Sequence, residues 1–113
     1  MIPMEANRKP VEVTDATFDE FVAENSMAVL DCWAAWCGPC RMLSPIIEQL
    51  AGERQDVVFG KLDVDRNSKV AMKFGIMSIP TLLYFKDGKL VDRTLGALPR
   101  KMIEERLVRL VAL

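Results

Sequence analysis

The chain has 113 residues, the size of one ordinary domain, and half of them are hydrophobic, so a core can form without metals or disulfides. Fifteen basic and sixteen acidic residues leave a net charge of −1, which argues against nucleic acid or an anionic membrane surface as the main partner. No apolar stretch reaches the length of a membrane span, and residues 1–10 lack the apolar part of a secretory signal. We therefore expect a soluble, cytoplasmic domain.

The first ten residues contain two prolines and no periodic pattern, so residues 1–10 are predicted to be a flexible arm and residues 11–113 a single domain. A short strand is expected at Val11–Val13. Thr14 or Asp15 can then cap a helix. The apolar residues of that helix fall on one face: Phe18, Phe21 and Val22.

The next part of the chain is a long apolar segment followed by an amphipathic one. Met27 to Ala35 is apolar apart from Asp31, as expected for a strand covered on both faces. A helix is predicted from Cys37 to Glu53, and Pro45 should kink it without ending the pattern. Its buried stripe has regular helical spacing and contains Leu43, Ile46, Ile47 and Leu50.

The second half of the chain predicts three strands and two helices. A strand at Val57–Val64 precedes a short helix over Arg66–Phe74, which Gly75 can close. Asp87-Gly88 between two apolar runs is typical of a β-hairpin. The strands of that hairpin are predicted at Thr81–Phe85 and Leu90–Leu95. A last helix from about Pro99 would bury Ile103, Leu107, Leu110 and Val111.

The order of these elements is β-α-β-α-β-α-β-β-α. Strands joined through helices should be parallel and connected by right-handed crossovers, whereas the final hairpin adds antiparallel strands. The sequence therefore predicts an α/β fold with a mixed five-stranded sheet and helices on both faces.

A pair of cysteines lies in the segment Trp-Cys-Gly-Pro-Cys at residues 36–40, between a buried strand and a helix. Cysteines three positions apart in a first helical turn project from nearly the same face, so they can close a disulfide or separate as thiols. The helix N-terminus favours a thiolate at Cys37, the predicted nucleophile. Cys40, a turn deeper, would then attack Cys37 and release a reduced substrate. Pro39 limits the start of the helix to one geometry.

Asp31 is a carboxylate within an apolar strand. Burial should raise its pKa, so it could accept the proton of Cys40 when that sulfur becomes a nucleophile. Lys61 is similarly placed in the next strand and could pair with Asp31, although an exposed lysine is nearly as consistent with the spacing.

A proline also precedes the apolar strand that begins at Thr81. A cis peptide before Pro80 is possible but is not required by the sequence. Met77 and Ile79 could form an apolar rim for a substrate peptide, while ordinary core packing is the better expectation for Ile79.

Taken together, these residues resemble the thioredoxin family over about Val11 to Leu110. The motifs that carry the resemblance are Asp31, Trp33, Trp36-Cys37-Gly38-Pro39-Cys40, Pro45, Lys61 with Leu-Asp-Val-Asp, Ile79-Pro80-Thr81, Lys86-Asp87-Gly88 and Gly96. The resemblance implies a thioredoxin fold, a cis peptide before Pro80, and Lys61 beside a buried carboxylate at Asp31. It also implies a substrate-contacting surface that contains Trp36, Gly38, Pro39, Ile79, Pro80 and Gly96. Cys32 stands where the family usually has an aromatic or other apolar residue; a buried, inert thiol is expected there, and an auxiliary redox site is the alternative.

The resemblance implies a protein-disulfide reductase, recycled by a flavin-containing thioredoxin reductase and acting on disulfide-containing proteins. We expect a monomer, since the domain is compact and nearly neutral. No metal is expected within one chain, because there is no histidine and three cysteines cannot complete a four-cysteine site. No bound cofactor is expected, because there is no Gly-x-Gly-x-x-Gly loop. A disulfide oxidase or isomerase is the first alternative, which Gly38-Pro39 and the absence of histidine disfavour. A binding module with an incidental cysteine pair, or a metal site shared by two chains, remains open as well.

Overall fold

The computed structural model describes residues 8–113, so most of the predicted arm lies outside the described residues. Arg8 is described, and its guanidinium donates hydrogen bonds to the carbonyls of Arg54 and Val57 at 2.7 and 2.9 Å. The elements are β1 (Val11–Glu12), α2 (Phe18–Glu24), β2 (Met27–Trp33), α3 (Gly38–Glu53), β3 (Val58–Asp63), α4 (Ser68–Lys73), β4 (Thr81–Lys86), β5 (Lys89–Leu95) and α5 (Arg100–Ala112). Within this part of the chain, no helix is both long and apolar enough to cross a membrane.

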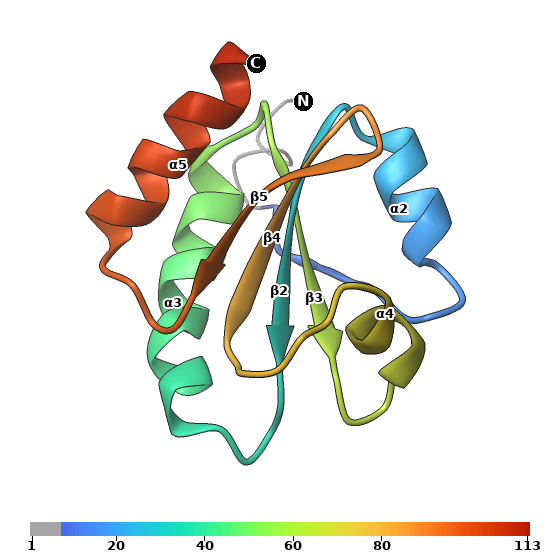
Figure 1. The fold of residues 1–113 in the computed structure, drawn as a ribbon. Helices are drawn as coiled ribbons and strands as arrows, with labels where there is room; N and C mark the ends of the chain where they lie inside the picture. The colour runs from blue at the N-terminus through green and yellow to red at the C-terminus, as the bar shows by residue number, and fades with distance from the viewer. Residues whose placement is uncertain (1–7) are drawn as a thin grey trace.

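The strands form one five-stranded sheet in the order β1-β3-β2-β4-β5. The strands β1, β3 and β2 run parallel, whereas β4 is antiparallel to both β2 and β5. Helices α3 and α5 cover one face of the sheet, and α2 and α4 lie on the other (Figure 1). The predicted mixed sheet with helices on both faces is confirmed.

One strand direction was predicted wrongly. The helix between the third and fourth strands was expected to connect parallel strands, but β4 runs antiparallel to β2, and Thr81 at its start pairs with Cys32 near the end of β2. The reason is length: α4 has six residues and spans about 9 Å, whereas a six-residue strand spans about 20 Å. The chain therefore turns at the edge where β2 and β3 end, and β4 begins there.

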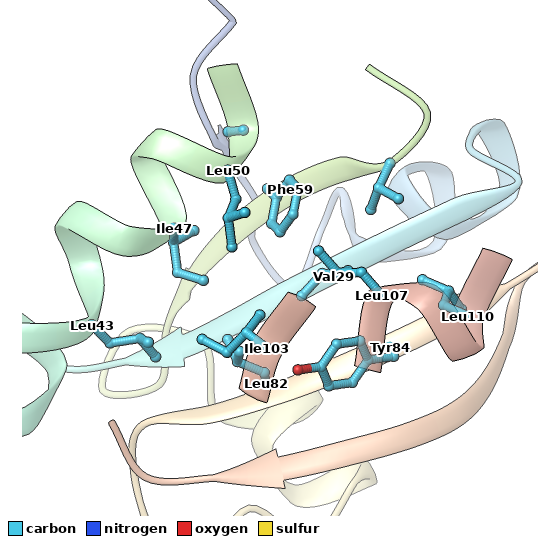
Figure 2. Packing of buried hydrophobic residues seen from close by; sticks show 12 residues of the cluster. Val29, Leu43, Ile47, Leu50, Phe59, Leu82, Tyr84, Ile103, Leu107 and Leu110 are labelled. Carbon is cyan, nitrogen blue, oxygen red and sulfur yellow. The ribbon is translucent and has the colours of Figure 1, made fainter. Parts of the chain in front are cut away.

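Two apolar layers fill the space between the sheet and the helices. The layer beneath α3 and α5 contains Val29, Phe59, Leu82 and Tyr84 from the sheet, and Figure 2 shows them packed against Leu43, Ile47, Leu50, Ile103, Leu107 and Leu110. On the other face, Phe18, Phe21 and Val22 of α2 are buried as predicted. Val111 was expected to be buried but is 43% exposed. Because it follows Leu110 by one residue, it is rotated by about 100° from the face that meets the sheet.

Capping at the start of α2 also differs from the prediction. The helix begins at Phe18, and the amide of Thr17 donates to Thr14 in the turn before it. Asp15 does not cap α2. Its carboxylate instead accepts the amides of Lys69 and Val70, at 3.1 and 2.9 Å, and so caps α4. The segment before α2 is therefore bonded to the first turn of a helix more than fifty residues away.

The predicted hairpin between β4 and β5 is confirmed. Asp87 and Gly88 have φ values of 51° and 83°, the left-handed conformation that a two-residue type I′ turn requires at both positions. Gly75, which follows α4, also has a positive φ of 61°, as expected for a residue that closes a helix.

Candidate active site

The cysteine pair lies where β2 ends and α3 begins. Cys37 is the N-cap residue of α3, and it forms a disulfide with Cys40 across a Cα–Cα distance of 5.3 Å. The amide of Cys40 donates to Cys37 Sγ at 3.2 Å. An amide that already points at this sulfur, together with the positive end of the helix dipole, would stabilise a thiolate there. Both features favour a thiolate at Cys37.

The loop before β4 packs against this pair. The Ile79–Pro80 peptide is cis, as the resemblance implied, and the carbonyl oxygen of Ile79 lies 3.8 Å from Cys37 Sγ. The amide of Gly96 donates to the carbonyl of Pro80 at 2.8 Å. Gly96 has a φ of 88°, which a residue with a side chain rarely adopts. The strand β4 begins at the same edge of the sheet as helix α3. Ile79, which precedes β4, therefore lies beside Cys37 Sγ although the two residues are 42 positions apart.

A groove of about 490 Å³ runs along the Cys37 side of the pair. Two of its side chains are strongly exposed, Trp36 at 68% and Met77 at 94%. The indole Nε1 of Trp36 donates to Asp65 at 2.9 Å, which fixes the ring. The lining residues are Trp36, Cys37, Gly38, Pro39, Val64, Ile76, Met77, Ser78 and Ile79. The groove is mostly apolar and can accept an extended peptide.

Ile79, Pro80 and Gly96 were all assigned to the substrate surface, but only Ile79 lines the groove. Ile79 is half-buried: it packs against the cluster that contains Cys37 and Cys40 and also lines the groove. Pro80 is buried, and Gly96 is half-buried beside it. Neither Pro80 nor Gly96 lines the groove; both hold the loop that does.

Asp31 is 2% exposed, and its Oδ1 atom has no hydrogen-bond partner among the described residues. Burial raises the pKa of this carboxyl to about 7, against the opposing effect of the positive charge on Lys61. Such a group can both take up and release a proton near neutral pH.

Lys61 is opposite Asp31 in the register of β2 and β3. The direct pair that the sequence suggested is not formed, since no ion pair within 4.0 Å joins them in residues 8–113. The ammonium group contacts two other residues: Nζ lies 3.4 Å from the hydroxyl of Ser44 and 5.0 Å from the centre of the Trp33 ring.

A second cavity, of about 260 Å³, lies on the Cys40 side of the pair. Asp31, Ser44 and Lys61 line it together with Cys40, and its other lining residues are Trp33, Ala34, Ala35 and Arg41. The disulfide therefore separates two different environments. Cys37 faces an apolar groove, and Cys40 faces a cavity whose lining includes the Asp31 carboxyl, the Ser44 hydroxyl and Lys61.

Cys32 follows Asp31 in β2, so its side chain lies on the opposite face of the sheet from that of Asp31. It is fully buried among residues of the α2 and α4 layer, which confirms the expected burial. Burial and then the neighbouring charge of Asp31 raise the pKa of this thiol to about 12.

Two site residues were missed by sequence reasoning. Ser44 follows Cys40 by four positions, so the helical repeat alone could have placed both on one face of α3. Asp65 gave no such signal, because its bond to Trp36 depends on how the end of β3 folds towards the cysteine loop.

Comparison with known proteins gives a consistent answer. A sequence model of one family, described as Thioredoxin, matches residues 9–109. The chain is 48% identical over 101 residues to Thioredoxin 2 of Chlorobaculum tepidum, covering 88% of this chain and 93% of the relative. It is 47% identical over 100 residues to a thioredoxin of Staphylococcus aureus, covering 86% and 93%.

Solved structures resemble this fold as well. Thioredoxin from Plasmodium falciparum has a TM-score of 0.82 and 35% identity, covering 88% of this chain and 97% of that one. A mutant thioredoxin from Halobacterium salinarum has a TM-score of 0.82 and 33% identity, covering 87% of each chain. The chain belongs to the thioredoxin family, and its Cys37–Cys40 pair is a thiol–disulfide exchange centre of the reductase and electron-carrier type.

Proposed function

We propose that this protein reduces disulfide bonds in other proteins, and that a thioredoxin reductase returns it to the dithiol form. The observation that carries the proposal is the pair of environments around the disulfide. The apolar groove at Cys37 suits an extended, uncharged peptide segment around a substrate disulfide. The cavity at Cys40 contains the carboxyl group of Asp31, which can exchange a proton.

The reaction proceeds in two exchange steps. The Cys37 thiolate attacks one sulfur of the substrate disulfide, and the other substrate sulfur leaves with the electron pair. Asp31 then takes the proton of the Cys40 thiol, and the Cys40 thiolate attacks Cys37 Sγ. The second substrate sulfur leaves as a thiolate and is protonated by water. The substrate has gained two electrons, and the protein holds the Cys37–Cys40 disulfide.

The surroundings of the pair suit these roles. Trp36, Gly38, Pro39 and Ile79 contact the substrate segment along the groove, and Met77 extends its apolar rim. Pro80 and Gly96 hold the loop whose carbonyl lies beside Cys37. No bound cofactor is needed, because the two sulfurs carry both electrons. The protein would work as a monomer in the cytoplasm, where a dithiol persists.

The reduction potential of the Cys37–Cys40 pair tests the direction of the reaction. After equilibration with glutathione, we expect a reduction potential of about −270 mV, the value typical of thioredoxin. A value above about −200 mV would instead assign the protein to disulfide formation or shuffling. Cys40→Ser should trap mixed disulfides with protein substrates, whereas Cys37→Ser should trap none.

The proton step is tested by Asp31→Asn. We expect the rate of substrate reduction at pH 7 to fall by up to about a hundredfold, because the amide cannot accept the proton of Cys40. Asp19→Asn, on the exposed side of α2, is the matched control and should leave the rate unchanged. A rate for Asp31→Asn equal to the native rate throughout pH 6 to 9 would remove Asp31 from the mechanism.

A further inference from the structure

We propose that Ser44 is a positioning residue for the proton step: its hydroxyl holds the ammonium group of Lys61 against the Trp33 ring and away from the Asp31 carboxyl. The inference rests on the proposed role of Asp31 and adds how the position of Lys61, whose charge acts on that carboxyl, is controlled.

The contacts of Lys61 define the arrangement. Its Nζ atom donates to Ser44 Oγ at 3.4 Å and lies 5.0 Å from the centre of the Trp33 ring. Asp31 is its direct partner in the strand register, yet no ion pair within 4.0 Å joins the two among the described residues. The Oδ1 atom of Asp31 is buried without a hydrogen bond in the same part of the chain. The Asp31 carboxyl is therefore an acceptor available in the same cavity, yet the ammonium group of Lys61 is bonded to Ser44 instead.

The position of Ser44 on α3 explains why it can do this. It follows Cys40 by four residues, so both side chains lie on one face of one helix and both line the cavity of about 260 Å³. Helix α3 thereby holds the Cys40 sulfur and the Ser44 hydroxyl, which binds Lys61, in a fixed relation to each other. An alanine at this position would offer no acceptor, and the unpaired Asp31 carboxyl would be the acceptor left to Lys61 in the cavity.

Three other charged residues, Arg41, Glu12 and Asp63, line the cavities that contain Lys61. Arg41 lines the same cavity, but its guanidinium donates to the carbonyl of Ala35 at 3.1 Å. Glu12 and Asp63 line a neighbouring cavity together with Lys61, and Glu12 is paired with Lys61 in the register of β1 and β3. Within residues 8–113 none of these groups is hydrogen-bonded to Ser44, so replacing Ser44 removes none of their bonds.

Arg93 of β5 is a further charged group near β2, where it acts on the thiol of Cys32 on the other face of the sheet. The β4 partner of Asp31 is Leu82, which does not titrate. If Lys61 turned towards Glu12 or Asp63 when released, Asp31 would bind its proton more tightly. The sign of any change at Asp31 therefore reports which way the lysine moves.

The chemical consequence appears when the disulfide is reduced. An external thiolate attacks Cys37 Sγ, the sulfur–sulfur bond breaks, and Cys40 leaves with the electron pair. That thiolate then takes a proton from the Asp31 carboxyl, which becomes a carboxylate. A lysine bonded to Asp31 would keep it ionised at neutral pH, and it would then have no proton to give. Held at Ser44, Lys61 leaves Asp31 able to act in both directions of the cycle.

The test is a titration of the Asp31 side-chain carboxyl carbon by NMR in the oxidised full-length protein. For Ser44→Ala we expect at least about a tenfold fall in the ratio of protonated to ionised Asp31 at pH 7, since a close opposite charge favours the ionised form. Ser44→Thr retains the hydroxyl and should restore the native ratio. In a Lys61→Met background, adding Ser44→Ala should cause no further change. Thermal unfolding of each variant checks that the fold is retained.

Each outcome decides between the possibilities. An unchanged Asp31 titration in Ser44→Ala overturns the proposal, as does a rise in the protonated fraction of Asp31 or a change that persists in the Lys61→Met background. The rate of reduction by dithiothreitol at pH 7 is measured on the same samples and should fall with the protonated fraction. If the titration moves and that rate does not, Ser44 positions Lys61 as proposed and the proton role of Asp31 fails.

Discussion

Replacing Asp31 with asparagine should make the stability of the oxidised protein much less dependent on pH. The carboxyl is 2% exposed, and burial raises its pKa from 3.8 to about 7. Below about pH 4 the group is neutral in both the folded and the unfolded protein, and burial of its charge costs nothing. As the pH rises from about 4 to 7, the unfolded chain releases this proton while the folded protein keeps it. The free energy of unfolding therefore falls over this range.

The size of the effect follows from the two pKa values. They differ by about three pH units, and each unit corresponds to about 1.4 kcal/mol, so the buried carboxyl costs about 4 kcal/mol above pH 7. The amide of asparagine has a nearly identical shape and does not ionise in this range. Burying an unpaired amide has its own cost, but that cost is the same at every pH.

Guanidinium unfolding of the native and Asp31→Asn proteins, both oxidised, measures this difference. The experiment is repeated from pH 4 to pH 8.5, and the difference in the free energy of unfolding is plotted against pH. All other titrating groups are common to both proteins and cancel. We expect Asp31→Asn to gain about 4 kcal/mol relative to the native protein between pH 4 and pH 8.

A difference that stays constant across this range would refute the reasoning. It would mean that Asp31 ionises equally easily in the folded and unfolded states, and so that it is hydrated or paired in the folded protein. Unfolding slopes that differ between the two proteins would require a correction for a changed unfolded state before the comparison is made.

Three further predictions concern other parts of the fold. Asp15→Ala should lower the free energy of unfolding by about 1 kcal/mol, because it removes the two bonds that cap α4, and urea unfolding measures the loss. Gly60→Ala should lower it by about 1–3 kcal/mol, because the new methyl group would lie 2.8 Å from atoms of Phe21 and Val13; thermal unfolding reports this as a lower midpoint. Cys32 should resist alkylation in the native reduced protein, because it is fully buried with a pKa near 12, and mass spectrometry of short iodoacetamide reactions locates the label.

Each of these predictions has a control in the same chain. Asp19→Ala removes an exposed carboxylate near Asp15 and should change the stability little; equal losses in both variants would contradict the capping role. Gly38→Ala adds a methyl group with no atom within 4 Å, so it separates crowding from loss of a glycine. Unfolding in guanidinium should expose all three cysteines to the reagent, and rapid labelling of Cys32 before unfolding would contradict its burial.

The sequence was sufficient for features that depend on neighbouring residues. The strand–helix junction at Cys37, the buried stripe of α3 and the Asp87-Gly88 turn are each encoded within a few positions, by periodicity or by a turn that two residues specify. Asp31 was expected to be buried because the residues on both sides of it are apolar. These features place the cysteine pair and its nearest carboxyl before any tertiary contact is known.

The rest depends on contacts between distant segments, which no local pattern contains. Asp15 and Val70 are 55 positions apart, so the cap that Asp15 supplies to α4 could not be distinguished from a cap on its own helix. The bond from Lys61 to Ser44 spans 17 positions, and spacing alone suggested Asp31 as the partner instead. The direction of β4 was also missed, because a short helix between strands ordinarily indicates a parallel crossover.

Cys32 belongs to a different buried cluster from Cys37 and Cys40, and this separation has a consequence for oxidative folding. Three cysteines within nine residues allow three different single disulfides in an unfolded chain, and proximity alone gives little preference among them. In the folded chain Cys32 points into the α2 and α4 layer, so neither pairing that includes it can form without breaking β2 away from its neighbours. A chain crosslinked through Cys32 therefore cannot complete the pairing of β2 with β3 and β4, and only thiol–disulfide exchange frees its cysteines to pair again.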